Sequence, residues 1–404
     1  MSEWKKVKLR DIASAIQTGP FGSQLHQSDY SDIGVPVVMP KDIINGCIDE
    51  STIARVESHH VERLSRHKIS EGDILYARRG DVGKCAYAVF AQQGWLCGTG
   101  CLRVTIDKEK AIPKFIFFQL QKRETIGWVE KHAIGATMLN LNTSILGDVP
   151  IELPLLSIQH RIATILSRYD SLIENYQKQI KLLEESAQRL YKEWFIDLRF
   201  PGHENTKIVD GVPEGWEKKK IKDLVDLKSG YAFKSSAFVE KGKYKIVTIK
   251  NVKDGVFDGD NVSYLNSVLE KMPSHCILQT GDILLSLTGN VGRICMVVGD
   301  NYLLNQRVAK LESKFPAFTY CLFRHYDTFV AINNLANGAA QQNVSPIRIG
   351  EMDMLVANDK IMHHFEKAAE NIRTNILNLF SQIRHLTEAR DRLLPKLMSG
   401  EIEV

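Results

Sequence analysis

The sequence predicts a mixed α/β fold built as an internal repeat, with two strand-rich globular domains separated by a long antiparallel two-helix coiled coil. Three observations lead to this prediction. A Gly-Asp-Ile-Leu segment at 72–75 returns at 281–284, and a Gly-x-Val-Gly-basic segment at 80–84 returns at 289–293. A long heptad segment follows each copy. Two copies in one polypeptide indicate a pseudo-dimer, which suits a two-part target.

The first domain, residues 1–153, mixes short apolar runs with Gly, Pro and Asp. Val35-Pro36-Val37-Val38 follows Gly34, and Ile74-Leu75-Tyr76 follows Gly72-Asp73. Such lengths and boundaries are typical of short strands. The run Lys114–Leu120 fits a buried helix or a buried strand, and the pattern alone leaves both open.

Beyond Pro154 the spacing of apolar residues changes to that of a heptad helix with one stutter. Its seam is formed by Ile158, Ile162, Ile165, Tyr169, Ile173, Tyr176, Ile180, Leu183, Ala187, Leu190 and Trp194. The positions 203 residues later repeat the seam and the stutter, with Arg390 the one departure from apolar character. We expect Ser157 and Asp359 near the two N-caps, Gly400 as the stop of the second helix, and Pro395 to kink or end its regular part.

Each heptad helix would extend for on the order of 55 Å at about 1.5 Å per residue. An apolar seam of that length has to pack against another helix, and the second copy of the repeat would provide one. The two helices would then be related by a pseudo-two-fold axis, with the globular domains at opposite ends. The alternative is that each helix packs on its own globe. We therefore divide the chain into domain 1–153, spacer helix 154–198, linker and second domain 199–358, and spacer helix 359–404.

The second domain opens like the first. Trp216-Glu217-Lys218-Lys219-Lys220-Ile221 echoes Trp4-Lys5-Lys6-Val7-Lys8-Leu9, and Val212-Pro213-Glu214-Gly215 precedes it in a linker rich in turn residues. Together with Leu153-Pro154, Gln159-x-x-Ile162 and Leu393-Leu394-Pro395-Lys396-Leu397-Met398-Ser399-Gly400, these motifs resemble the specificity subunit (HsdS) of type I restriction-modification systems. The resemblance covers essentially the whole chain. Met362 stands where the second copy would repeat Gln159.

The resemblance implies a non-catalytic, DNA-binding subunit with two target-recognition domains, each reading one half of an asymmetric bipartite site in double-stranded DNA. It also implies assembly with two methyltransferase subunits and with restriction subunits that act as translocase and nuclease. No cofactor is then expected in this chain. S-adenosylmethionine, ATP and Mg²⁺ would belong to the partner subunits.

Composition and motifs are compatible with that reading. The formal net charge of +4 permits local nucleic-acid contacts without requiring them. No apolar run approaches the roughly 20 residues of a membrane span, and no secretory signal is seen, so we expect a cytoplasmic protein without membrane contact.

Gly80-Asp81-Val82-Gly83-Lys84 lacks the other residues of a phosphate-binding loop. No Asn/Asp-Pro-Pro-Phe/Tyr motif of adenine methylation occurs. Cys85, Cys97 and Cys101 are expected as core side chains, with no metal.

Base reading is then expected from loops, first of all from the turn after each Gly-Asp-Ile-Leu strand. Arg78, Arg79 and Lys84 in the first copy correspond to Leu287, Thr288 and Arg293 in the second, where Asn290 is a further candidate. The shared basic residue suits a phosphate, and the differing residues suit unlike half-sites. The alternative is a surface hairpin with structural glycines and solvated charges.

Other loops follow the same logic, each with local loop capping or strand-end hydrogen bonding as the alternative. Their candidates are Thr99 in the first copy and Asn305, Gln306, Arg307, Gln341 and Gln342 in the second. The loops Gln17–Ser23 and Lys228–Tyr231 carry hydroxyl and amide groups that could contact phosphates, and they receive less weight. The aromatic end of the first heptad helix, Tyr191, Trp194 and Phe195, is expected to seal the helix against a globe or to contribute to the docking surface of a methyltransferase subunit.

Two other functions remain open from the sequence alone. The chain could be a self-contained DNA methyltransferase or nuclease with an unrecognised active site. It could also be a coiled-coil adaptor that does not bind DNA.

Overall fold

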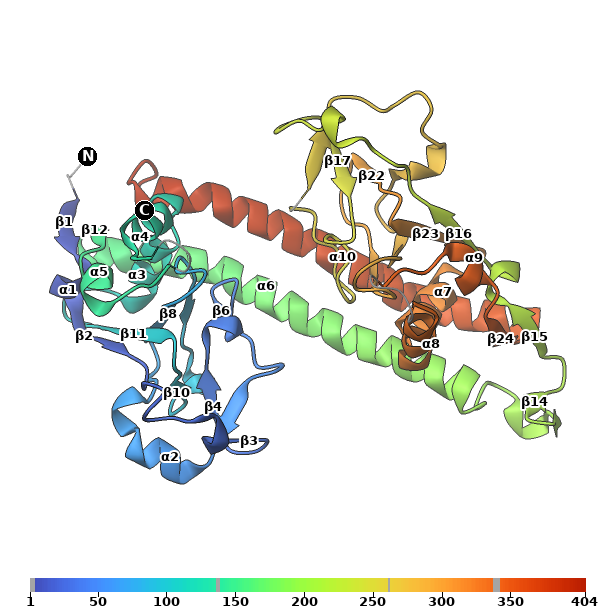
Figure 1. Cartoon of the computed structure of the whole chain (residues 1–404), viewed down its shortest axis with the longest axis horizontal. Helices are drawn as coiled ribbons and strands as arrows, with labels where there is room; N and C mark the ends of the chain where they lie inside the picture. Colours follow the sequence, from blue (N-terminus) through green and yellow to red (C-terminus); the bar gives the residue numbers. More distant parts are fainter. Residues whose placement is uncertain (1–3, 136–138, 261, 337–341) are drawn as a thin grey trace. The chain divides into compact units, whose positions relative to one another are not determined.

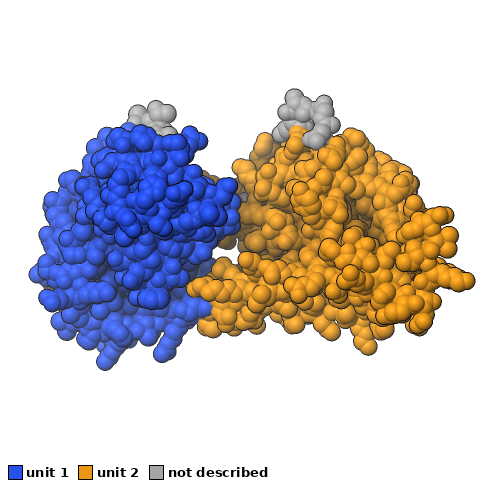
Figure 2. Space-filling model, turned by 90° about the horizontal axis from the view of Figure 1, so that it is seen from below, with its two compact units in different colours: residues 1–171, 386–404 blue, residues 172–385 orange. Residues whose placement is uncertain are grey.

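A computed structural model describes residues 4–135, 139–260, 262–336 and 342–404 of the chain. The chain divides into two compact units, one of residues 1–171 with 386–404 and one of residues 172–385 (Figure 2). The boundaries between the units fall inside the two long helices. This division therefore does not separate the helices from the globular domains. No helix within the described ranges is long and apolar enough to cross a membrane.

The first unit begins with short strands and small helices and ends where the first long helix starts. Its strands are β1 (Lys5–Lys8), β2 (Ala13–Thr18), β3 (Tyr30–Ser31), β4 (Val35–Val38), β5 (Ile43–Ile44), β6 (Cys47–Ile48), β7 (Ala54–Val56), β8 (Ile74–Ala77), β9 (Cys85–Tyr87), β10 (Leu96–Cys97), β11 (Cys101–Ile106) and β12 (Pro150–Leu153). Its helices are α1 (Leu9–Ile12), α2 (Ser58–Arg63), α3 (Pro113–Leu120), α4 (Arg123–His132), α5 (Thr143–Gly147) and the first part of α6 (Leu156–Tyr191) (Figure 1).

The described strands of this unit form two four-stranded sheets, ordered β2-β11-β8-β9 and β10-β4-β7-β3, and two two-stranded sheets, β1-β12 and β5-β6. The first sheet is antiparallel, with Leu102 paired with Tyr76 and Thr18 on either side. In the second sheet β10 runs parallel to β4. The run 114–120, which the pattern left open, is helix α3. Pro113 starts it, and its side chains from Phe115 to Leu120 are all buried, which explains why no amphipathic period was visible.

The second unit repeats this plan. Its strands are β13 (Ile208–Val209), β14 (Val212–Pro213), β15 (Glu217–Lys220), β16 (Val225–Ser229), β17 (Tyr244–Val247), β18 (Ser263–Leu265), β19 (Ile277–Leu278), β20 (Ile283–Ser286), β21 (Ile294–Met296), β22 (Tyr302–Leu304), β23 (Val308–Ser313) and β24 (Asp353–Val356). Its helices are α7 (Pro316–Arg324), α8 (Tyr326–Ala336), α9 (Pro346–Gly350) and the first part of α10 (Asp359–Met398).

The sheet order confirms the internal repeat. β16-β23-β20-β21 matches β2-β11-β8-β9, and β22 runs parallel to β17 as β10 does to β4. The strand at the start of each domain pairs with the last strand of that domain, β1 with β12 and β15 with β24. The two copies thus share one mixed α/β fold dominated by short strands.

The long helices pack antiparallel within each unit. In the first unit Ile162 and Leu166, near the start of α6, share a core with Leu397 and Met398 at the end of α10. In the second unit Tyr191, at the end of α6, packs with Phe365 near the start of α10, at 6.3 Å between ring centroids. A π-helical turn, Lys192–Ile196, extends α6. The predicted coiled-coil pairing of the two repeats is confirmed.

The ends of these helices differ in detail from the prediction. Helix α6 already begins at Leu156, so Ser157 lies inside it, and α10 is capped by the Asn358 carboxamide, which accepts from Ile361 N at 3.1 Å. At the second helix Asn358 and Asp359 adjoin and either can cap, whereas at the first helix Ser157 is the first residue after Pro154 with a side chain that can cap. Pro395 does not end α10, which continues to Met398, and Gly400 follows with φ +73°.

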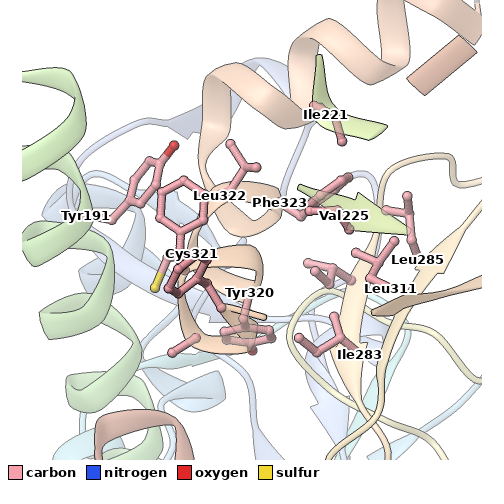
Figure 3. Packing of buried hydrophobic residues seen from close by; sticks show 14 of the residues in the cluster. Tyr191, Ile221, Val225, Ile283, Leu285, Leu311, Tyr320, Cys321, Leu322 and Phe323 are labelled. Carbon is pink, nitrogen blue, oxygen red and sulfur yellow. The ribbon is translucent and has the colours of Figure 1, made fainter. Parts of the chain in front are cut away.

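The aromatic end of α6 is absorbed by the core of the second unit. Figure 3 shows Tyr191 of α6 next to Cys321 and Leu322 of α7, which belong to the same hydrophobic cluster as Tyr320 and Phe323. The rings of Phe195 and Phe318 lie 4.8 Å apart. Aromatic pairs of this kind add about 0.5–1.5 kcal/mol each beyond the burial of their area. The second domain is therefore anchored on the helix that precedes it in the chain.

Candidate nucleic-acid interface

The two turns singled out in the sequence have the same backbone framework. The hairpin β8–β9 is closed by a hydrogen bond from Ala77 N to Lys84 O at 2.9 Å, and the hairpin β20–β21 by one from Ser286 N to Arg293 O at 2.9 Å. We call residues 78–84 the first turn and residues 287–293 the second turn. Gly80 and Gly289 have φ of +75° and +73°, a region that disfavours other residues.

The residue that begins each turn is held by two matching backbone hydrogen bonds. Arg78 donates to Gly100 O and accepts from Leu141 N, both at 2.8 Å. Leu287 donates to Arg307 O at 3.0 Å and accepts from Val344 N at 2.9 Å. Arg78 and Leu287 are therefore equivalent positions, and each turn lies between two other loops that the sequence had marked.

The fold brings these loops together at one edge of each domain. In the first domain Thr99 Oγ1 donates to Pro20 O at 2.9 Å, which ties the loop 98–100 to the loop 17–23. In the second, Gln306 N donates to Tyr231 O at 3.0 Å, which ties 305–307 to 228–231. Four segments far apart in each copy of the sequence thus form a single surface.

Side chains of the first domain present positive charge on this surface. Arg79 and Lys84 are exposed and Arg78 is half-buried, with its guanidinium 5.8 Å from the ring centroid of Phe21. Lys84 pairs with Asp81 at 2.9 Å, where both side chains are more than half exposed. The Thr99 hydroxyl is committed to Pro20, so it acts within the loop.

The second turn is fastened by its own side chains. Thr288 is buried, and its hydroxyl donates to Asn343 Oδ1 at 2.9 Å. The Ser286 hydroxyl donates to Asn290 O at 2.5 Å. The Thr288 hydroxyl is therefore used inside the chain, while the Asn290 side chain remains exposed and Arg293 is half-buried.

The remaining candidates of the second domain lie on the same edge. Gln306 and Arg307 are exposed, and the Asn305 carboxamide accepts from Arg307 N at 3.3 Å. The Gln342 side chain is exposed, and the Gln342 backbone carbonyl accepts a hydrogen bond from Gly289 N at 3.0 Å. Gln342 therefore adjoins the second turn. Gln341 lies outside the described residues.

Sequence reasoning missed two supporting features of the edge. The Asp of each Gly-Asp-Ile-Leu segment pairs with a basic residue of the neighbouring strand, Asp73 with Arg103 at 3.4 Å and Asp282 with Lys310 at 3.0 Å. The residues Arg103 and Lys310 are 207 apart, a repeat signal that was available. The second missed feature is the contact between the ring of Phe21 and the guanidinium of Arg78. These residues are far apart in the sequence, and only the fold brings them together.

The described residues can also be compared with the requirements of a metal site and of a nucleophile. In the ranges described above, no group of three or more His, Cys, Asp or Glu could hold a metal ion. Burial raises the pKa of the Cys97 thiol to about 12, which disfavours the thiolate that a nucleophile or ligand needs. Burial also lowers the pKa of His67 from its ordinary value, and its Nδ1 lies 3.0 Å from Thr18 O.

Two of the three aromatic residues offered as a partner surface are not on the surface. Tyr191 and Phe195 are 5% and 6% exposed in the core of the second unit. Trp194 is half-buried, with its ring 5.6 Å from that of Phe365. The segment packs the helix against the second domain, which was the first of the two alternatives, because large aromatic rings next to α7 gain most by burial.

A family model described as the type I restriction modification DNA specificity domain matches residues 1–185 and 213–351. The chain belongs to this family. The two matched segments correspond to the two copies of the repeat, and the gap between them contains the aromatic end of α6 and the linker.

Relatives of this family align over the whole chain. The chain is 25% identical to the specificity subunit of the type I restriction enzyme MjaIX of Methanocaldococcus jannaschii, over 100% of this chain and 94% of the relative. It is 22% identical to the HindI specificity subunit of Haemophilus influenzae, over 100% of both. Among solved structures, the S subunit of a type I restriction-modification system from M. genitalium has a TM-score of 0.60 at 18% identity, covering 98% of this chain and 96% of that one. The last likeness is one of fold.

Proposed function

We propose that this chain is the DNA-recognition subunit of a type I restriction-modification complex. Residues 1–153 read one half of an asymmetric bipartite site, and the second domain within 199–358 reads the other. The helices in 154–198 and 359–404 set the distance between the half-sites. The offset of 203 between seam residues is constant along both helices, as a fixed spacer requires.

The observation that carries this proposal is a shared backbone with unlike side chains. Both turns are held by the same backbone hydrogen bonds, yet one begins with Arg78 and the other with Leu287. Phosphate contacts position a protein on DNA and base contacts specify the sequence. A conserved frame with variable side chains is what two readers of different half-sites need.

Chemistry in this proposal belongs to the partners. Two methyltransferase subunits would bind S-adenosylmethionine and transfer the methyl group, and restriction subunits would use ATP and Mg²⁺ to translocate and cleave DNA. This chain binds DNA in the cytoplasm and contributes no catalytic group. Family membership and the names of full-length relatives support this assignment.

A map of methylated bases in cells with and without the gene tests the proposal. We expect one bipartite asymmetric motif to lose methylation on deletion and to regain it on complementation. Replacing residues 1–153 with the corresponding domain of a relative should then alter one half of the motif and leave the other half unchanged.

Two results would overturn the proposal. An unchanged methylation map on deletion, in cells that express the partner subunits, would favour an adaptor that does not select DNA. Methyl transfer to DNA by the purified chain with S-adenosylmethionine and no partner would favour a self-contained methyltransferase.

A matched replacement of residues 359–398 by the helix of a relative should leave both half-sites intact, because it exchanges none of the edge residues.

A further inference from the structure

We infer that Phe21 positions the guanidinium of Arg78 to read a guanine in the half-site of the first domain, and that the second domain has no reader at this position. The inference rests on the proposed function and deepens it, because it names a base and a residue pair. Phe21 belongs to a loop that the sequence marked only for phosphate contact.

The geometry of the pair is that of a cation above an aromatic ring. Arg78 Cζ lies 5.8 Å from the centroid of Phe21, within the approximately 6 Å range of such contacts. Phe21 is 52% exposed although it is a large apolar side chain. Its ring therefore adds little to the domain core, and the guanidinium of Arg78 lies against it.

Hydrogen bonds of the described residues fix the backbone of Arg78 but not its Nε. Its Nε is buried and has no acceptor among the residues that the structure describes, whereas its backbone is fixed on both sides. Arg103 of the same domain is the opposite case. Its guanidinium donates to Gln17 Oε1 at 2.8 Å and to Arg66 O at 3.2 Å, and it pairs with Asp73. Arg103 is a structural arginine, whereas the buried Nε of Arg78 is without such a partner in the described ranges.

The second domain has replaced both members of the pair. Arg78 corresponds to Leu287, which is 4% exposed and belongs to the core. Gly19 N donates to Cys101 O at 2.9 Å and Gly230 N donates to Val308 O at 3.1 Å, so these glycines are equivalent. Two residues further on, Phe21 corresponds to Ala232. The ring and the guanidinium are thus present together in one copy and absent together in the other.

Guanine is the base that this arrangement suits. A planar guanidinium can donate two parallel hydrogen bonds to the O6 and N7 atoms of guanine in the major groove. A guanidinium held near a ring has fewer orientations than a free one, which reduces the conformational freedom lost on binding. Where Leu287 is buried, selection of the other half-site falls to the exposed amide and guanidinium side chains of Asn290, Gln306 and Arg307.

The experiment is to map methylated motifs in cells that carry the variant gene at its own locus with all partner subunits. Arg78→Lys keeps the charge but replaces the planar fork of donors with a single ammonium group, which weakens the bidentate contact. We expect discrimination at one base pair of one half-site to fall about 10-fold or more, while the other half-site is unchanged. Phe21→Ala should relax the same base pair by about 2- to 5-fold.

Two further variants separate a positioning role from packing. Phe21→Tyr keeps the ring and should retain full discrimination, whereas Phe21→Leu keeps apolar bulk without the ring and should behave like Phe21→Ala. Phe90→Ala is the matched control, since Phe90 is a 71% exposed phenylalanine of the same unit. It should leave the motif unchanged.

The inference is overturned if Arg78→Lys leaves every position of the motif as selective as before, or relaxes a position that is not guanine. It is also overturned for Phe21 if the Leu variant discriminates as well as the wild type. In either case an exchange of residues 1–153 that still alters one half-site leaves the proposed function standing. An exchange that alters neither half-site would contradict the proposed function itself.

Discussion

The first turn and the second turn have the same backbone hydrogen bonds, but their side chains differ in where they lie. The first turn carries Arg78, Arg79 and Lys84 against a single acidic residue, and its starting side chain lies on the ring of Phe21 at the surface. The second turn directs Leu287 and Thr288 inward, where they pack and hydrogen-bond. The difference shows that the frame of a reading loop can be kept while its chemistry is exchanged.

The largest effect is expected from exchanging the starting residues of the two turns. Leu287→Arg would place a charge in the core of the second unit and should lower the free energy of unfolding by on the order of 3 kcal/mol or more. Arg78→Leu removes a half-buried charge next to a ring and should change it by no more than about 1 kcal/mol. Thermal or denaturant unfolding of both variants measures the contrast.

Equal losses of stability from the two substitutions would contradict this contrast. Leu287→Met serves as the control in the second turn, because it nearly conserves volume and should cost less than about 1.5 kcal/mol.

A smaller effect is expected from the side-chain hydrogen bond that fastens the second turn. Thr288→Val keeps the shape but removes the bond to Asn343 Oδ1 and should destabilise the second domain by about 1 kcal/mol. Asn140, beside the first turn, has a buried Oδ1 without a hydrogen-bond partner in the described part of the chain. Asn140→Ala should therefore be nearly neutral, and a larger loss there than at Thr288 would break the comparison.

The basic residue shared by the two turns should behave alike in both. Lys84→Ala and Arg293→Ala are each expected to weaken DNA binding without changing the preferred sequence, because each would remove the phosphate contact that we propose for these residues. The slope of log binding constant against log salt should become shallower by about 0.9 in each variant. Titrations of the complete complex at several salt concentrations measure this. A changed motif in the methylation map would show that either residue reads bases.

The smallest effect is expected at Asp81, the acidic member of the first turn. Its ion pair with Lys84 is exposed, and such pairs contribute roughly 0–1 kcal/mol. Asp81→Asn should leave the melting temperature nearly unchanged. It should strengthen DNA binding slightly at low salt, because Lys84 is released for phosphate. Weaker binding would indicate that Asp81 orients Lys84 instead.

Much of the fold was predictable because long helices and repeats leave periodic patterns in the sequence. The seam from Ile158 to Trp194 and its copy were visible, and so was the hairpin around Gly80. The cap at Asn358 was placed too late, since Asn and Asp adjoin and either can cap. The burial of Tyr191 on α7 and the contact of Phe21 with Arg78 depend on residues far apart in the chain. Local pattern does not report such contacts.

The departure of Arg390 from the apolar seam has a consequence for which halves can associate. Arg390 pairs with Asp170 of the opposing helix at 2.9 Å. The residues 203 positions away from these two are Ala187 and Arg373. Two copies of the first half would leave Asp170 opposite alanine, and two copies of the second would bring Arg390 opposite another arginine. The ion pair therefore favours association of the first half with the second half over association of two identical halves. This preference for an unlike partner, which is typical of a heterodimer, is present here within a single polypeptide.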